Sequence, residues 1–132
     1  MSVEASDSVF GVNLSPIRDI LRTHGFESTT SRTLRGISGA LQDFDLVARR
    51  GNETIAIDVL PAADRKKSEM KLVNMRAKIW DTAPDIAIAI SPAKSTPDMK
   101  EMSRFYKLNL IEAENEQELE EEFEKHLVLS LQ

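Results

Sequence analysis

The 132-residue chain contains no cysteine. This absence excludes disulfide bonds and thiolate-ligated metal centres, and it disfavours a small secreted domain held together by cross-links. No stretch approaches eighteen consecutive apolar residues, so the sequence predicts no membrane-spanning helix. The N-terminal sequence MSVEASDSVF lacks the basic start and the apolar centre of a signal peptide. We therefore expect a cytoplasmic protein that does not enter a membrane.

Aromatic side chains are also scarce, at 5% of the chain, so aliphatic residues must build the core. Apolar residues account for 41% and charged residues for 30% of the sequence, which is typical of a soluble globular protein. The length suits one domain with a substantial core. Residues 1–14 show no firm periodicity, and we predict a flexible or short helical N-terminus there, followed by a single domain over residues 15–132.

The formal net charge is −5, but it is unevenly distributed along the chain. Residues 1–80 hold 12 Lys and Arg against 10 Asp and Glu, whereas residues 81–132 hold 5 against 12. The acidic excess lies mainly in the segment IEAENEQELEEEFEKH. This segment indicates a solvated helix face or, alternatively, a surface that imitates nucleic acid or repels a wrong partner.

Turn and capping residues divide the chain into helices and strands. Ser15-Pro16 starts a helix, Gly51-Asn52 turns a hairpin, and Pro61 ends the strand that precedes it. The predicted order α-β-β-β-α-β-α-β-α gives a single α/β domain with a mixed five-stranded sheet flanked by helices on both sides. The elements are expected at residues 15–24, 26–34, 41–49, 53–59, 64–80, 85–91, 96–106, 108–112 and 115–131.

Two of the predicted helices carry apolar stripes. On helix 64–80 we expect the stripe to face the sheet and the lysines to lie on the other side. In the last helix an apolar residue recurs every four positions, and this stripe either docks on the chain's own sheet or forms a homodimer contact. The first stripe is Met70, Val73, Ala77 and Trp80, widened by Leu72 and Ile79, with Lys67, Lys71 and Lys78 opposite; the second is Leu119, Phe123, Leu127 and Leu131.

Two aspartates, Asp45 and Asp58, stand in the apolar strand sequences FDLVA and IAIDVL, where a carboxylate is costly without a partner. Because side chains alternate along a strand, a favourable hairpin register places both acids on one face. Close carboxylates repel each other, so a divalent cation would favour their meeting, and Mg²⁺ accepts such oxygen ligands and activates water for phosphodiester cleavage. Alternatively, Asp45 pairs with Arg49 or Arg35, and Asp58 pairs with an arginine or a helix N-terminus.

The segment GISGALQDFDLVARRGNETIAIDVL, together with the element order, resembles the PD-(D/E)xK superfamily, whose fold is called restriction-endonuclease-like. It is similar to Mrr-like and archaeal resolvase-like members, in which an acid on the second strand is followed by a hairpin and by (Asp/Glu)-x-Lys on the third. The resemblance covers roughly residues 15–112. It implies that Asp45 and Asp58 are the metal-binding catalytic acids of a Mg²⁺-dependent endodeoxyribonuclease, with DNA as the substrate.

The resemblance fails at one position, because Leu60 stands where the family has its lysine. That lysine is thought to position or help deprotonate the attacking water and to stabilise charge, and leucine can do neither. Either a lysine of the following helix takes its place, or the site is degenerate and the chain keeps only the fold. Lys66, Lys67 and Lys71 are the candidate substitutes, and we assign Lys67 to the predicted catalytic set.

Basic residues near the two acids would grip DNA phosphates if the fold brought them together at the mouth of the pocket. Taken singly, each is equally compatible with ordinary solvated charge. The glycines that flank Ser38 allow either a plain turn or the close approach of a phosphate. The predicted nucleic-acid-binding residues are Arg35, Arg49, Arg50, Lys66 and Lys71.

Two functions follow from these patterns. The first is a DNA-associated nuclease that uses Asp45, Asp58, a substitute lysine and Mg²⁺. The second is a non-catalytic interaction or regulatory module, an inactive nuclease homologue that docks on a DNA-processing or transcription partner. The acidic C-terminal half and Leu60 favour the second. Both functions depend on Asp45 and Asp58 pointing into one common cleft.

Overall fold

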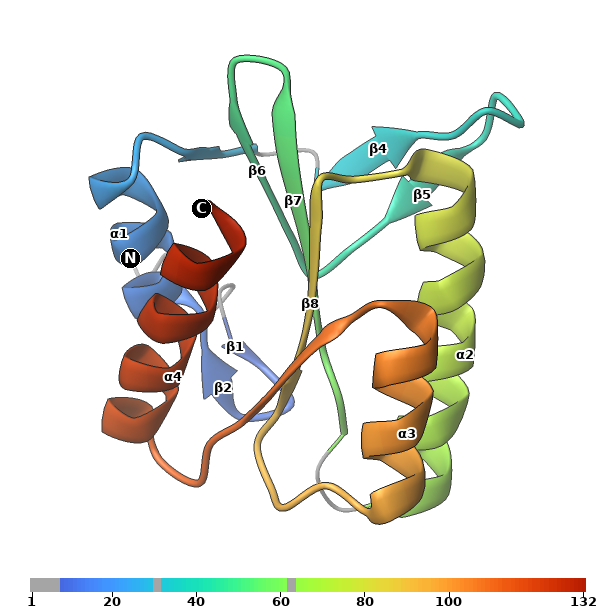
Figure 1. The fold of residues 1–132 in the computed structure, drawn as a ribbon, viewed down its shortest axis with the longest axis vertical. Coiled ribbons are helices and arrows are strands. Elements are labelled where there is room, and N and C mark those ends of the chain that lie inside the picture. Colours follow the sequence, from blue (N-terminus) through green and yellow to red (C-terminus); the bar gives the residue numbers. More distant parts are fainter. Residues whose placement is uncertain (1–7, 30–31, 62–63) are drawn as a thin grey trace.

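The computed structural model describes residues 8–29, 32–61 and 64–132. They form one α/β domain around a mixed five-stranded sheet, as predicted (Figure 1). The strand order is β3-β6-β7-β8-β9, in which β3, β6 and β7 are antiparallel and β7, β8 and β9 are parallel. These strands are β3 (Glu27–Ser28), β6 (Leu46–Arg50), β7 (Glu53–Val59), β8 (Ile86–Ser91) and β9 (Asn109–Glu112).

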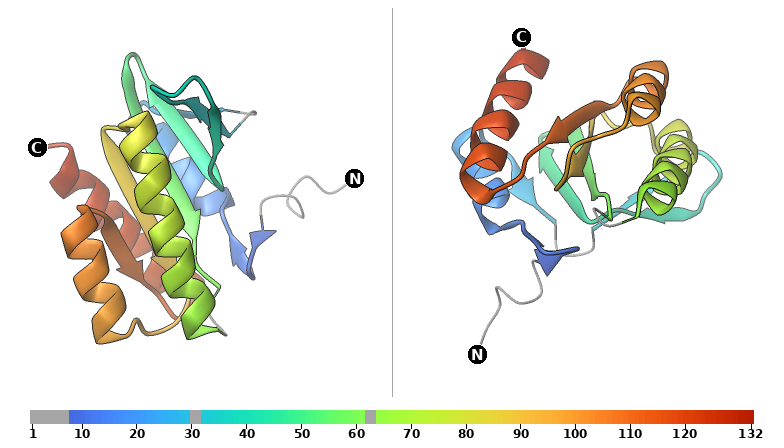
Figure 2. Two further views of the ribbon diagram at one scale, coloured as in Figure 1. Left: turned by 90° about the vertical axis from the view of Figure 1, so that its right-hand side faces the viewer. Right: turned by 90° about the horizontal axis from the view of Figure 1, so that it is seen from below.

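Helices cover both faces of the sheet and give the domain three layers (Figures 1 and 2). On the face of α1 and α4, Phe123 belongs to the same core cluster as Ile57. On the face of α2 and α3, Leu72 packs in a second cluster with Ala89. No helix in the described part of the chain has the length and apolar character needed to cross a bilayer. The helices are α1 (Ser15–Thr23), α2 (Arg65–Thr82), α3 (Pro97–Tyr106) and α4 (Glu116–Ser130).

Three of the helices begin where a side chain caps them. Asp64 accepts a hydrogen bond from the Lys67 amide at 3.0 Å and starts α2. Thr96 does the same for α3, and Asn115 for α4. Each cap satisfies a backbone N–H group that has no partner within the helix, so these boundaries match the predicted helix starts.

The first two predicted strands, 26–34 and 41–49, are each broken into two pieces. Their outer halves pair with each other as a separate two-stranded ribbon, β4 (Thr33–Arg35) with β5 (Leu41–Asp43), which reaches toward α2 (Figure 2). The inner halves, β3 and β6, join the main sheet. On the second segment the chain bends at Phe44 and Asp45, where Phe44 packs beside Ile79 of α2. The break in the strand that the sequence predicted as continuous therefore falls where the chain meets the helix.

The N-terminal residues 8–14 contain a small hairpin instead of the predicted short helix. β1 (Ser8–Val9) pairs antiparallel with β2 (Val12–Asn13). Phe10 and Gly11 form the turn, with φ values of 49° and 80°, as expected for a tight hairpin whose two central residues are left-handed. Val12 is buried in the main core, which anchors the hairpin. Residues 1–7 of the predicted flexible or helical N-terminus lie outside the described residues.

The stripe prediction is confirmed for α4 and wrong for α2. On α4, Leu119, Phe123 and Leu127 are buried in the chain's own core. On α2, the buried residues are Ser68, Leu72 and Met75, and Ile79 is partly buried beside them. The predicted stripe of Met70, Val73, Ala77 and Trp80 instead faces solvent.

Candidate functional site

Asp45 and Asp58 meet where the β6–β7 ladder ends. The register pairs Leu46 with Ile57, so its continuation sets Asp45 opposite Asp58. The chain bends there, and the two carboxylates replace the missing ladder bonds. The Asp45 amide donates to Asp58 Oδ1 at 2.9 Å, and the Val59 amide donates to Asp45 Oδ2 at 2.8 Å. The predicted neighbourhood of the two acids is therefore present.

Two lysines of α2 reach these carboxylates. Lys71 Nζ donates to Asp45 Oδ2 at 2.9 Å and to the Val59 carbonyl at 2.6 Å. Lys78 Nζ donates to Asp58 Oδ2 at 2.7 Å and to the Asp43 carbonyl at 2.7 Å. The lysines are seven positions apart, so two turns of helix carry both to the same side. We call Asp45, Asp58, Lys71 and Lys78 the carboxylate–lysine cluster.

Aromatic rings cover the two ammonium groups. Lys71 Nζ lies 4.9 Å from the centre of the Phe10 ring, and Lys78 Nζ lies 4.5 Å from that of Phe44. An ammonium over a ring face is attracted by the ring quadrupole, and more strongly where water is partly excluded. The N-terminal hairpin and the bend before β6 therefore each contribute one aromatic ring that covers a lysine of the cluster.

Asp58 is the most enclosed member, with 1% of its surface exposed. Burial raises the pKa of its carboxyl above the ordinary value, because removal from water disfavours the charged form. Lys78 opposes this shift through its charge and its hydrogen bond, while the charge of Asp45 raises the pKa further. The negative charge of Asp58 therefore depends on the ammonium of Lys78.

This donor set does not fit a magnesium ion. Both Asp58 oxygens and Asp45 Oδ2 already accept hydrogen bonds within the chain. Two carboxylates and two ammonium groups also leave no net negative charge to attract a cation. No group of three or more acidic, histidine or cysteine residues within residues 8–29, 32–61 and 64–132 is placed to hold a metal. The predicted acids are together, but three of their four carboxylate oxygens accept bonds from lysines and backbone amides.

Sequence reasoning identified one of the two lysines as a candidate and missed the other. Lys71 contacts Asp45, whereas Lys66 and Lys67 lie exposed in the first turn of α2, and the bonds to the two acids come from Lys71 and Lys78 instead. The pairs expected for Asp45 with Arg49 or Arg35 are replaced by the pair with Lys71. Lys78 lies two helical turns from Lys71, and this spacing was the available signal.

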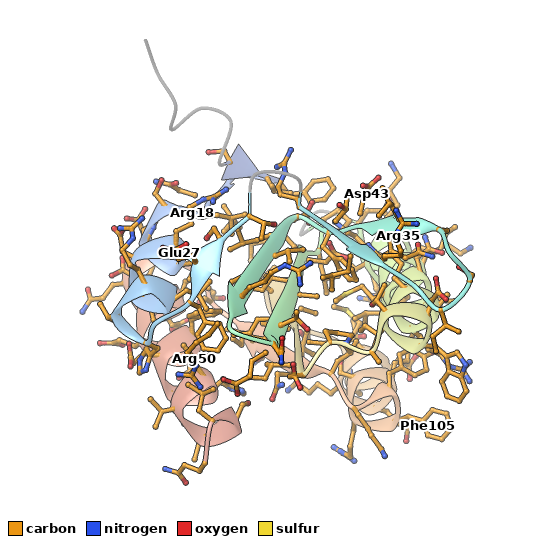
Figure 3. The ribbon with its side chains drawn as sticks, turned by 90° about the horizontal axis from the view of Figure 1, so that it is seen from above. Arg18, Glu27, Arg35, Asp43, Arg50 and Phe105 are labelled. Carbon is orange, nitrogen blue, oxygen red and sulfur yellow. The ribbon has the colours of Figure 1, made fainter. Side chains whose placement is uncertain are left out.

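The other predicted phosphate-binding residues do not converge on the cluster. Arg49 and Arg50 lie four and five residues from Asp45 along the chain, which is roughly 13–17 Å of strand. Arg50 donates to the His24 carbonyl, pairs with Glu53 and stacks on a ring. Figure 3 shows it far across the structure from Arg35. The fold therefore spreads these arginines over separate surfaces.

The glycine-flanked loop at Ser38 binds a carboxylate of its own chain. Asp81 Oδ1 accepts from the Ser38 amide at 2.9 Å, and Oδ2 accepts from the Ser38 hydroxyl at 2.8 Å and from Gln42 at 2.9 Å. The bond from Gln42, followed by those from Ser38, lowers the pKa of Asp81 below its ordinary value. The loop thus fastens the β4–β5 ribbon to the C-terminal end of α2.

Gly36 allows this loop to approach Asp81. A methyl group at Gly36 would overlap the Asp81 carboxylate. We expect Gly36→Ala to lower the free energy of unfolding by about 1–3 kcal/mol, as other overpacked substitutions do. Urea denaturation of Gly36→Ala, Asp81→Ala and the double variant measures this, and the double variant should be no less stable than Asp81→Ala alone. Strictly additive losses would contradict the clash.

Comparison with known proteins supports the fold alone. No protein-family model matches the chain, and no curated protein sequence matches it. Among solved structures, a protein of unknown function, AF1548, is similar with a TM-score of 0.57 and 17% sequence identity. The match covers 85% of this chain and 62% of that chain, so the present chain spans less than two thirds of its neighbour.

Proposed function

We propose that this protein is a non-catalytic domain of nuclease-like architecture that works as an interaction or regulatory module. The pairing of both candidate catalytic acids with lysines of one helix carries the proposal. Lys71 and Lys78 supply the positive charge that a divalent cation would otherwise bring. In this role the carboxylate–lysine cluster holds α2 against the sheet. The resemblance to the PD-(D/E)xK superfamily suggests a partner in DNA processing or transcription.

The position of Leu60 supports the same function. This residue occupies the place of the family's lysine, yet its side chain is fully buried and packs with Leu72 and Met75 beneath α2. A lysine there would place an ammonium group in an apolar cluster at high cost. Leucine at this position therefore fits a site in which core packing has replaced a catalytic role.

One observation favours the alternative function, a Mg²⁺-dependent endonuclease. Lys71 lies 2.9 Å from Asp45, where a relocated catalytic lysine would be needed, so it would fill that role in place of Lys67. For this alternative to hold, a cation would have to displace the bonds that Asp58 makes to Lys78 and to the Asp45 amide. The carboxylate oxygens of Asp45 and Asp58 would be its protein ligands.

A DNA cleavage assay separates the two functions. Wild-type protein, Asp45→Asn and Lys71→Met are incubated with supercoiled, linear and branched DNA in millimolar Mg²⁺ or Mn²⁺. Asp45→Asn is the matched control, because the amide oxygen can still accept from Val59 while the charge is lost. We expect the three proteins to give the same background cleavage. Metal-dependent cleavage by the wild type that Asp45→Asn lacks would establish the endonuclease.

A further inference from the structure

The outer face of α2 presents large apolar side chains to solvent. Trp80 is 82% exposed, Met70 61% and Val73 48%, and Ala77 between them is also exposed. We call Met70, Val73, Ala77 and Trp80 the α2 stripe. Exposed apolar side chains that adjoin one another, unlike single scattered ones, are a feature of interaction sites. The opposite side of the helix already packs on the sheet through Leu72 and Met75, so the stripe has no remaining role in the chain's own core.

The spacing of the α2 stripe is that of a helix–helix seam. Its members follow one another at intervals of three, four and three residues, which is the alternation of a and d positions in a heptad. A side chain set of this kind runs along one narrow line of the helix and meets a second helix at a shallow crossing angle. The expected occupant is therefore another amphipathic helix.

We propose that the occupant is α2 of a second copy of this chain, aligned antiparallel. In an antiparallel pair centred on Met75, Met70 faces Trp80 of the second copy, and Val73 faces Ala77 of the second copy. One kind of layer then joins the two large side chains, Met70 and Trp80, and brings the thioether to an indole ring. The other kind joins the two small side chains, Val73 and Ala77. A parallel pair in register would instead set Trp80 against Trp80 and leave Ala77 against Ala77.

The charges beside the α2 stripe fit the same alignment. On one flank the antiparallel pair brings Lys67 near Asp81 of the second copy and Asn74 near its own equivalent. Asp81 is held in place by Ser38 and Gln42, so its charge is fixed at the edge of the seam. A parallel pair would oppose Lys67 to Lys67 and Asp81 to Asp81. Charge complementarity therefore selects the antiparallel dimer.

The surrounding surface leaves room for this contact. Figure 2 shows α2 running along the outside of the domain between α3 and the β4–β5 ribbon. Phe105 of α3, 76% exposed, and Trp80 line a common cavity beside the helix, so Phe105 adds apolar surface at one end of the seam. A helix of 18 residues is about 27 Å long, and a contact confined to four side chains of it belongs to the small class of interfaces that weak complexes use. We expect a concentration-dependent dimer.

The test uses Trp80 as a built-in reporter, because it is the only tryptophan in the chain. Sedimentation and the Trp80 emission maximum are measured across a dilution series of the full-length protein. We expect dimers that dissociate on dilution, with the emission shifting to longer wavelength as Trp80 becomes hydrated. A monomer at every concentration with constant emission would overturn the proposal and leave the stripe to a different protein.

Three variants test the contact and its orientation. Ala77→Glu should weaken dimerisation at least tenfold, whereas Leu129→Glu, which adds the same charge on the exposed face of α4, should dimerise like the wild type. Lys67→Glu should weaken it severalfold, since two Glu–Asp repulsions replace two attractions. Unchanged dimerisation of Ala77→Glu would contradict the contact, and unchanged dimerisation of Lys67→Glu would contradict the antiparallel orientation. Circular dichroism confirms that each variant is folded.

Discussion

Lys78→Met should lower the free energy of unfolding by about 3–5 kcal/mol, because it leaves a buried carboxylate without its counter-charge. Asp58 is almost fully enclosed, so water cannot take the place of the lysine. Urea denaturation at neutral pH measures the loss. Lys71→Met is the matched control: Asp45 is partly exposed, and we expect a loss of about 1 kcal/mol or less. Equal losses in the two variants would contradict the central role of Asp58.

The pH dependence of the Lys78→Met variant gives a second readout. Burial already raises the pKa of Asp58 in the folded protein, and removal of Lys78 should raise it further. A carboxyl with a raised folded pKa binds its proton more tightly when folded, so its destabilising effect is full above that pKa and fades as pH falls toward 3.8. The deficit of Lys78→Met should therefore shrink on acidification. Adding Asp58→Asn should recover most of the stability at neutral pH.

Phe123→Ala should cost about 3–5 kcal/mol of unfolding free energy, the usual range for removing a buried aromatic ring. Phe123 is fully buried on α4 in the main core cluster. Leu129→Ala, at an exposed position of the same helix, should change stability by no more than about 0.5 kcal/mol. Thermal or urea denaturation compares the two. If Phe123→Ala altered the oligomeric state and left the stability unchanged, the apolar stripe of α4 would be a dimer contact and not part of the core.

The sequence was sufficient to predict a mixed five-stranded sheet and the helix boundaries, but not the break in each of the first two strands. Caps such as Asp64 and Asn115 accept hydrogen bonds from residues three positions away, so the helix start can be predicted from the local sequence. The mixed sheet follows from the hairpin at Gly51 and from the alternation of strands and crossover helices after it. The break at Phe44 could not be predicted in the same way, because the surroundings of Phe44 include Ile79, which lies on a helix distant in the sequence.

The orientation of α2 on the sheet is set by tertiary contacts, and the predicted apolar stripe did not indicate it. Two stripes on this helix have similar apolar content, one through Leu72 and Met75 and one through Val73 and Trp80. The stripe through Val73 and Trp80, which has the larger side chains, is the exposed one. In the observed rotation of the helix, Lys71 and Lys78 reach the carboxylates and Leu72 enters the core. An isolated helix sequence contains no record of charges on the opposing sheet.

The candidate site was half predictable for a related reason. The hairpin around Gly51 sets a register that places Asp45 opposite Asp58, and alternation along the strands puts them on one face. Which bases meet them depends on how α2 lies on the sheet, so Lys78 was missed and Arg49 was wrongly considered as a partner. Long-range placement, not residue chemistry, was the missing information.

The most direct test of the carboxylate–lysine cluster is a Mn²⁺ titration followed by amide resonances. Mn²⁺ broadens the signals of nearby nuclei, and the amides of Asp45 and Val59 both donate to cluster carboxylates. If the lysines have replaced a metal, these two signals should keep their line widths at millimolar Mn²⁺. Selective broadening of Asp45 and Val59 in the wild type, abolished in Asp45→Asn, would contradict the account.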